Sequence, residues 1–394
     1  MTPRPAIAAW ILATLAATVP ATARAQSADS AAAAPAHRGV PGGYDDKPYL
    51  AGVFGRILVG GYVEAQGVYE RADGVTEEFG FVVERWNIFT STQVSPAVTV
   101  WAELEFEEGG EEVRLELAQV DIRLRESIQV RAGMLLLPIG RFNLAHDGPR
   151  HEFTARPIEA TDLLGATLSQ PGLGLFGRFE GARGVLTYEA YGVNGYMDGL
   201  LLDSPDGTRL PAGRTNVEDQ NASPALVGRV AFAPRGFELG LSGYHGAYNV
   251  YRLDGMTVDD RRDVSIGVLD VQARVAGVVL LGEGSLVDVE IPSALVGINA
   301  SRQSGFYLDV SRRFARGLIG GLAASSLTAA VRLEAVDFDR DIAGDSVQRL
   351  SAALNLRTSD ETVIKLGYAR GRSRDRFNNA AEDATLSLGL ATYF

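Results

Sequence analysis

Residues 97–107, AVTVWAELEFE, alternate between apolar and polar side chains along their length. The apolar phase holds Val98, Val100, Ala102, Leu104 and Phe106, and the other phase holds Thr99, Trp101, Glu103, Glu105 and Glu107. Successive side chains of a β-strand point to opposite faces of its sheet. We therefore expect a strand with one apolar face and one polar, acidic face. A β-sandwich gives the same pattern, so the connections between strands must decide the architecture.

The connections alternate in length along the rest of the chain. Residues 95–96 and 126–127 make short ones, whereas residues 196–223 and 249–262 make long ones. Outer-membrane barrels show this alternation, with brief periplasmic turns and extended external loops. The pattern gives about sixteen strands, an even number as in single-chain bacterial barrels. We predict an all-β fold, a transmembrane antiparallel β-barrel over residues 56–394.

The N-terminal residues have the composition of an export signal. Arg4 precedes an uncharged apolar run, and Ala23-Arg24-Ala25 resembles a cleavage site. Residues 1–25 are therefore predicted to be a signal peptide, which is favoured over a membrane anchor because the apolar run is short. Residues 26–55 are rich in Ala, Pro, Gly and Ser and are predicted to form a flexible periplasmic lead-in.

Composition excludes several classes of protein. The chain has no cysteine, so neither a disulfide-stabilised scaffold nor a thiolate metal site is possible. Its formal net charge of −12 excludes nucleic acid as an expected partner. All but two of the 37 basic residues are arginines, which stay charged in any environment and present a planar fork to oxyanions. We expect no cofactor and no catalytic residue.

The chain ends in an alternating strand, DATLSLGLATYF, whose last residue is Phe394. Leu386, Leu388 and Leu390 share its face. A terminal aromatic residue on such a strand resembles the signal that the bacterial barrel-assembly machinery recognises. We therefore expect that machinery as a partner through Phe394, and the bacterial outer membrane as the location.

One connection is much too long to be an ordinary connection in a compact domain. After the strand at residues 128–137, residues 138–171 show no strand pattern, and loops of this length are usually functional. We predict that this third external loop folds into the barrel and forms the narrowest part of a pore. The charges expected at this constriction are Arg131, Arg141, Arg150, Arg156, Asp147 and Glu152. Facing charges of opposite sign would order water and select solutes by size and charge.

Other charged residues are predicted to line the pore. Glu103 and Glu105 lie on the polar phase of the strand at residues 97–107. In residues 113–125 the apolar phase changes, so we predict a β-bulge near Ala118-Gln119. Beyond this bulge, Arg123 and Arg125 would point inward.

The region around the long loop resembles the phosphate-selective porin family of Gram-negative outer membranes. The similarity is carried by VRAGMLLLPIGRFNL at residues 130–144, by AQVDIRL at residues 118–124 and by YGVNG at residues 191–195. This resemblance implies a sixteen-stranded, trimeric porin with an inward third loop and basic residues in the channel. The chain departs from that family in having only Lys47 and Lys365 as lysines.

A barrel of about sixteen strands is too wide to be filled by its own side chains and leaves an aqueous channel unless it is plugged. The expected function is passive diffusion of small hydrophilic solutes and ions, with anions or phosphate as the preferred class and membrane lipid around the barrel. One alternative is a closed barrel that acts as an anchor or adhesin. A second is an outer-membrane hydrolase, which would need His146, His151 or His245 beside a nucleophile. A third is a soluble periplasmic β-protein.

Overall fold

The computed structural model describes residues 40–54, 57–214, 219, 221–320 and 322–394. The predicted signal peptide lies outside the described residues, as do residues 26–39 of the predicted lead-in.

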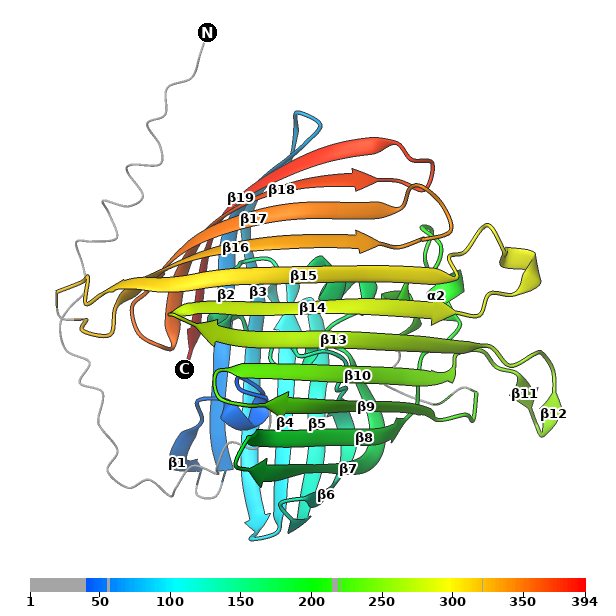
Figure 1. Cartoon of the computed structure of the whole chain (residues 1–394), viewed down its shortest axis with the longest axis horizontal. Coiled ribbons are helices and arrows are strands. Elements are labelled where there is room, and N and C mark those ends of the chain that lie inside the picture. The colour runs from blue at the N-terminus through cyan, green and yellow to red at the C-terminus, as the bar shows by residue number, and fades with distance from the viewer. Residues whose placement is uncertain (1–39, 55–56, 215–218, 220, 321) are drawn as a thin grey trace. The chain divides into compact units, whose positions relative to one another are not determined.

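Among the described residues, sixteen strands form one closed antiparallel ring (Figure 1). They are β2 (Ile57–Ala72), β3 (Val75–Ser95), β4 (Val98–Glu107), β5 (Glu112–Arg125), β6 (Ile128–Leu136), β7 (Ser169–Gly181), β8 (Gly184–Val193), β9 (Ala225–Ala233), β10 (Phe237–Ala247), β13 (Asp263–Val275), β14 (Val278–Val289), β15 (Arg302–Arg316), β16 (Ser326–Asp337), β17 (Ser346–Arg357), β18 (Thr362–Arg374) and β19 (Ala380–Tyr393). Each strand pairs with the next, and the predicted all-β barrel is confirmed.

The two ends of the barrel sequence meet at a seam between β19 and β2. Their pairing runs from Asp383 opposite Ala72 to Tyr393 opposite Tyr62. Beyond it, the backbones of Gly61 and Phe394 exchange hydrogen bonds of 3.2 and 2.9 Å. The C-terminal residue therefore completes the ring.

Smaller elements occupy the connections. Strand β1 (Leu50–Phe54) pairs with β2, β11 (Arg252–Leu253) and β12 (Met256–Thr257) form a small hairpin, and α2 (Gly199–Leu202) is a single turn. Short 3-10 segments are Tyr44–Asp46, Glu108–Gly110, Phe142–Leu144, Gly148–Arg150, Leu210–Gly213 and Ser293–Leu295, and Glu159–Leu163 is π-helical. Within the part of the chain that the structure describes, no helix has the length and apolar composition needed to cross a membrane.

The outward face of the ring is apolar. Its exposed side chains include Leu226, Val230, Phe232, Leu239, Leu241, Leu269, Leu308, Leu333, Leu350, Leu366 and Leu388. In β4, Leu104 is 41% exposed, whereas Glu103 and Glu105 on the other phase are 1% and 0% exposed. The alternation in residues 97–107 therefore separates an outer apolar surface from inner carboxylates.

The predicted bulge in β5 exists, two residues before its expected place. Opposite β4, Glu103 pairs with Leu117 and Leu104 with Leu115, so Glu116 is the additional residue. An additional residue reverses which phase faces inward. Beyond it Gln119 is buried while Ile122 is exposed.

The inner surface has an apolar part, here called the apolar half, and a charged part, here called the charged half. The strands of the apolar half also carry the buried charges Arg229, Glu238, Asp270 and Glu283. In the apolar half, inner side chains of β8, β9, β10, β13 and β14 pack against residues of the long connections: Tyr191, Val193, Val227, Tyr244, Ile266, Val268, Val287, Leu137, Ile158, Leu163, Tyr196 and Leu200. In the charged half, β2, β4 and β16 to β18 carry the buried Glu64, Glu103, Glu105, Arg332, Glu334, Arg357 and Lys365.

Candidate functional site

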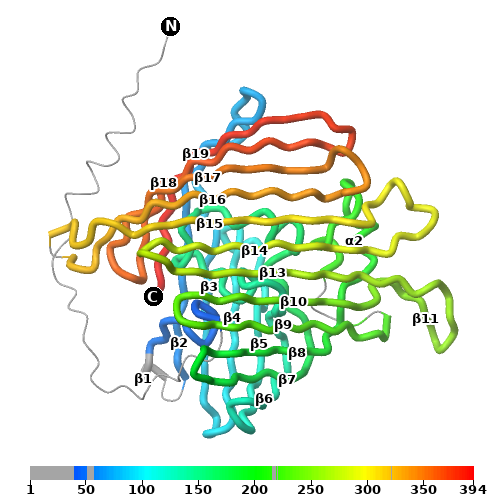
Figure 2. Tube along the Cα trace, in the orientation of Figure 1, coloured from blue at the N-terminus to red at the C-terminus, as the bar shows by residue number. Residues whose placement is uncertain are grey.

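The connection between β6 and β7, residues 137–168, is the predicted third external loop and is here called loop three; its trace is drawn in Figure 2. It contacts residues of β10, β14, β16, β17 and β18. It leaves β6 at Leu137, whose N–H donates to Leu168 O at 3.0 Å. Gly140 then turns the chain with φ of 71°, and its N–H donates to Ser242 Oγ of β10 at 3.1 Å. A Cβ at Gly140 would lie 2.3 Å from Glu283 Oε2 of β14, so only glycine fits.

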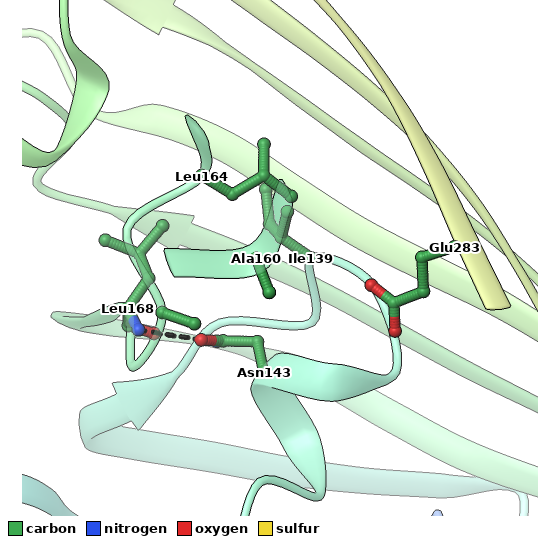
Figure 3. A pocket seen from close by; sticks show the side chains of 7 residues that line it. Ile139, Asn143, Ala160, Leu164, Leu168 and Glu283 are labelled. Carbon is green, nitrogen blue, oxygen red and sulfur yellow. Dashed lines mark hydrogen bonds between the residues drawn. The ribbon is translucent and has the colours of Figure 1, made fainter. Parts of the chain in front are cut away.

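Asn143 ties the two ends of loop three together. Its amide nitrogen donates to Leu137 O at 2.7 Å and to Leu168 O at 2.9 Å, and its oxygen accepts from Leu168 N–H at 2.7 Å (Figure 3). Asn143 and Leu168 border a small cavity that is also lined by Ile139, Ala160, Leu164, Ala166 and Glu283. The buried side chain thus satisfies backbone groups that no strand pairs.

Buried cationic side chains of β16, β17 and β18 hold loop three to the wall of the ring. Lys365 Nζ donates to the carbonyl oxygens of Gly148 and Phe153, at 2.8 and 2.9 Å. Arg357 donates to Pro149 O at 2.9 Å. Arg332 donates to Ala155 O, also at 2.9 Å. We call Arg332, Arg357 and Lys365 the wall clamp. They were not among the predicted site residues, although each lies on the polar phase of an alternating strand.

Two of the predicted constriction arginines are buried beside carboxylates of the wall. Arg131 of β6 has its Nε 2.7 Å from Asp121 Oδ1 and its Nη1 2.8 Å from the Tyr191 hydroxyl. Arg141 of loop three has its Nη1 3.0 Å from Glu238 Oε1 of β10. Both charges are therefore compensated within the barrel.

The other two predicted arginines are more accessible. Arg150 is exposed and donates to the Tyr393 hydroxyl at 3.0 Å, and its Nη1 lies 3.3 Å from Asp46 Oδ2. Arg156 is half-buried, with its Nη2 3.4 Å from Glu105 Oε1. Arg150 and Arg156 contact different parts of the chain.

The predicted acids of loop three, Asp147 and Glu152, contact residues other than the four predicted arginines. Asp147 Oδ1 lies 3.1 Å from Lys47 Nζ. Glu152 accepts from Asn355 at 2.6 Å and lies 3.2 Å from Arg357 Nη2. Arginines and acids thus share the interior of the ring, but each is paired with the wall or with the N-terminal segment.

The predicted lining residues differ in environment. Glu103 and Glu105 are buried in the charged half. Arg123 donates to Pro96 O near a short turn, and Arg125 is exposed at the end of β5. Partly exposed inner charges lie elsewhere, at Arg85, Glu107, Arg114, Glu152 and Arg349. These side chains, which are 13–31% exposed, mark where water reaches the interior.

The described part of the predicted lead-in makes specific contacts with loop three and the wall. Val40 packs on Leu136 and Leu144, Pro41 O accepts from Arg141, and Tyr44 contacts Trp101 edge-on. Residues 40–49 therefore lie inside the ring beside loop three. No periodicity marks these residues, so sequence reasoning had no signal for them.

His146 of loop three is buried in an ion pair. Its Nε2 lies 2.8 Å from Glu116 Oε1, and its Nδ1 lies 3.1 Å from Asn143 O. Burial alone would lower the pKa of His146, but the Glu116 carboxylate outweighs burial and raises it. Among the described residues, no group of three or more acidic or histidine side chains has the arrangement of a metal site.

Stability should depend on the charge of His146. A raised histidine pKa contributes stability that is complete below about pH 6.5 and is lost as pH rises through the folded-state value. We expect the urea midpoint of the wild type to fall between pH 6 and pH 9, and His146→Gln to lack this component. His245→Gln, at an exposed site, is the control. Identical pH profiles for wild type and His146→Gln would contradict the assignment.

His245 is the histidine closest to a hydrolase-like arrangement. Its Nδ1 lies 2.9 Å from Ser265 Oγ, but its Nε2 is 4.0 Å from Asp263 Oδ2. Asp263 is instead held by Arg261 at 2.8 Å. Nucleophilic catalysis needs one hydrogen bond between the nucleophile and the base and a second between the base and the orienting carboxylate. Ser265, His245 and Asp263 make the first of these contacts but not the second.

Comparison with known proteins shows the fold. No protein-family model matches the chain. An uncharacterised protein of Aquifex aeolicus is 29% identical over 133 residues, which are 33% of this chain but only 28% of that protein.

Solved structures match most of the chain. They include Salmonella typhi OmpF in complex with daunomycin (TM-score 0.55, 14% identity, 86% of this chain and 98% of that one). The outer membrane channel DcaP of Acinetobacter baumannii has a TM-score of 0.52 at 11% identity, covering 86% and 97%. Pseudomonas putida OprB has a TM-score of 0.51 at 9% identity, covering 85% and 93%. The chain thus has the barrel fold of these outer-membrane proteins.

Proposed function

We propose that this protein is an outer-membrane porin through which small hydrophilic solutes and ions diffuse passively. The observation that carries the proposal is a closed sixteen-stranded ring, within the described residues, with apolar side chains outside and charged side chains inside. In a bilayer, a β-sheet satisfies every backbone polar group only if it is closed. The structural similarity to the channel DcaP supports the same function.

The partly exposed inner charges suggest the route. Arg85, Glu107, Arg114 and Arg349 flank the charged half, where side chains are in contact with water. The apolar half is packed and offers no such surface. Solutes would therefore pass beside loop three, along the charged half.

The charge preference is proposed to be anionic, set by the arginines of loop three and its surroundings. Support comes from Arg150 and Arg156, whose side chains are partly accessible, whereas Arg131 and Arg141 are buried in ion pairs and would act at longer range. Phosphate is the anion implied by the family resemblance. Asp147 and Glu152 would limit the preference, since they add negative charge to the same loop.

The proposal also includes a route of export and a signal for assembly. A signal peptide at residues 1–25 would direct the chain across the inner membrane, and Phe394 would be read by the barrel-assembly machinery. The position of Phe394 at the closing seam supports a role for this residue in assembly. A homotrimer is the expected oligomer, again from the resemblance.

Single-channel recording in planar bilayers tests the function. We expect discrete current steps from the wild type, and a reversal potential in a salt gradient that shifts toward cations in Arg141→Ala/Arg150→Ala. A unit charge about 4 Å from an ion is worth ~1 kcal/mol in water, or roughly a fivefold change in permeability ratio. Arg370→Ala removes an exposed ion pair with Glu382 and is the control. Absence of current steps would favour a closed anchor or adhesin, and an unchanged reversal potential would remove the two arginines from the filter.

A further inference from the structure

A lysine ammonium group is enclosed within the ring. Lys47, in the segment at residues 40–49, has its Nζ 2.5 Å from Glu103 Oε2 of β4 and 3.1 Å from Asp147 Oδ1 of loop three. The side chain of Lys47 is 3% exposed, and each carboxylate is 1% exposed. It is one of two lysines in a chain whose other basic residues are arginines.

The carboxylates that bind this ammonium are held by groups other than Lys47. Asn87 Nδ2 donates to Glu103 Oε1 at 3.1 Å. The Tyr393 hydroxyl donates to Asp147 Oδ2 at 2.7 Å. Asn87 and Tyr393 belong to β3 and β19, so the acceptors are fixed by the wall of the ring. Glu103 and Asp147 are therefore positioned by side chains of the wall as well as by Lys47.

One aromatic ring, part of a buried aromatic cluster, lies beside the ammonium. Lys47 Nζ lies 4.9 Å from the centroid of the Phe89 ring. Tyr62, Phe89 and Tyr393 form one buried cluster, and Tyr49 packs against it. Ring faces attract cations, and apolar walls accommodate methylene groups. The site thus matches a primary ammonium on an aliphatic chain.

The charge around the site requires a cation. Glu116 is a third buried carboxylate, linked to Glu103 through Asn87 and paired with His146. If Lys47 were absent, Glu103 and Asp147 would lack their cation, and an uncompensated buried charge is strongly destabilising. A divalent metal is not the matching occupant, because the described residues contain no metal-type cluster of three acidic or histidine side chains.

We propose that Glu103, Asp147 and Phe89 form a binding site for the primary ammonium group of a diffusing solute, and that Lys47 occupies this site as a tethered competitor. The solute class is alkylammonium compounds, such as amines and amino acids with a cationic side chain. This inference rests on the proposed porin function only in so far as the ligand reaches the site through the channel. Binding itself can be measured without ion flow.

Chemical rescue tests the site. Full-length Lys47→Ala in detergent should melt at a lower temperature than wild type, and n-butylammonium at roughly 10–100 mM, the range of a tethered group's effective concentration, should restore part of the loss. Tetramethylammonium has no N–H donors and should not. The same amine should leave wild type unchanged, because Lys47 already fills the site.

Two variants make the test specific. Lys47→Ala/Glu103→Gln removes one carboxylate charge, and n-butylammonium should no longer raise its melting temperature. Arg313→Ala breaks an exposed pair with Asp360, and the amine should not change its melting temperature at any concentration. If Lys47→Ala does not fold, refolding yield with and without n-butylammonium is the readout, and Lys47→Gln is the milder variant. Equal effects of the amine on wild type and Lys47→Ala, or of tetramethylammonium and n-butylammonium, would overturn the proposal.

Current recordings separate this inference from the proposed function. In planar bilayers n-butylammonium should reduce the current through Lys47→Ala at a concentration about tenfold or more below that needed for wild type. If neither protein conducts, the porin function fails while the melting experiment still decides the site. If both conduct and the amine acts equally on them, the ammonium site is refuted and the porin function stands.

Discussion

Replacing Arg332 with methionine is expected to lower the free energy of unfolding by about 3–5 kcal/mol, the usual cost of removing one partner from a buried ion pair. The guanidinium of Arg332 is 1% exposed and contacts both oxygens of Asp309, at 2.6 and 2.8 Å. It also donates to Ala155 O and lies over the Phe153 ring at 4.3 Å. The substitution would leave Asp309 without its counter-ion and would release one attachment of loop three.

Urea unfolding followed by tryptophan fluorescence in lipid vesicles measures this loss. Arg313→Met, which breaks the exposed pair with Asp360, is the matched control and should cost less than about 1 kcal/mol. Arg332→Met/Asp309→Leu should recover much of the lost stability, because no buried charge then remains unpaired. A loss for Arg332→Met no larger than that of the control would contradict the role of the wall clamp.

Excising the inner part of loop three should increase single-channel conductance severalfold. Replacing residues 140–166 with a short Gly-Ser linker removes the segment that contacts β10, β14, β16, β17 and β18 from inside the ring. A ring of sixteen strands then leaves a wide aqueous lumen. The measurement is the current step in planar bilayers at fixed salt.

Deletion of the β11–β12 hairpin, residues 252–257, provides the control, because this hairpin belongs to a separate two-stranded sheet. Heat-modifiable gel mobility establishes that both variants are folded. Equal conductance for wild type and the loop-three excision would show that the loop does not restrict the pore.

The barrel could be predicted from sequence because its signals are local. Alternation in residues 97–107 and the bulge in β5 both follow from the period of two in side-chain direction. One available signal was not used: Asp73-Gly74 is a typical two-residue hairpin turn, and both residues have positive φ, 47° and 84°. This turn joins β2 and β3 into one long hairpin.

The interior was less predictable because its contacts join residues far apart in the chain. Arg150 meets Tyr393, and Lys365 meets Gly148. No local pattern encodes such pairs. The apolar half was not predicted, because it forms where loop residues distant in sequence pack on strands such as β9 and β13. Where a loop fills the lumen, the inner face of a strand becomes a protein core, and alternation between apolar and polar residues disappears.

The seam has a consequence for biogenesis. In the proposed export pathway, β2 emerges before its partner β19. Until translocation ends, β2 keeps an open hydrogen-bonding edge, and open edges recruit strands of other chains. Closure also pairs residues that are far apart in sequence, such as Tyr62 and Tyr393, which is a slow kind of step. A periplasmic holding factor should therefore matter most in the interval between emergence of the first hairpin and arrival of the carboxyl terminus.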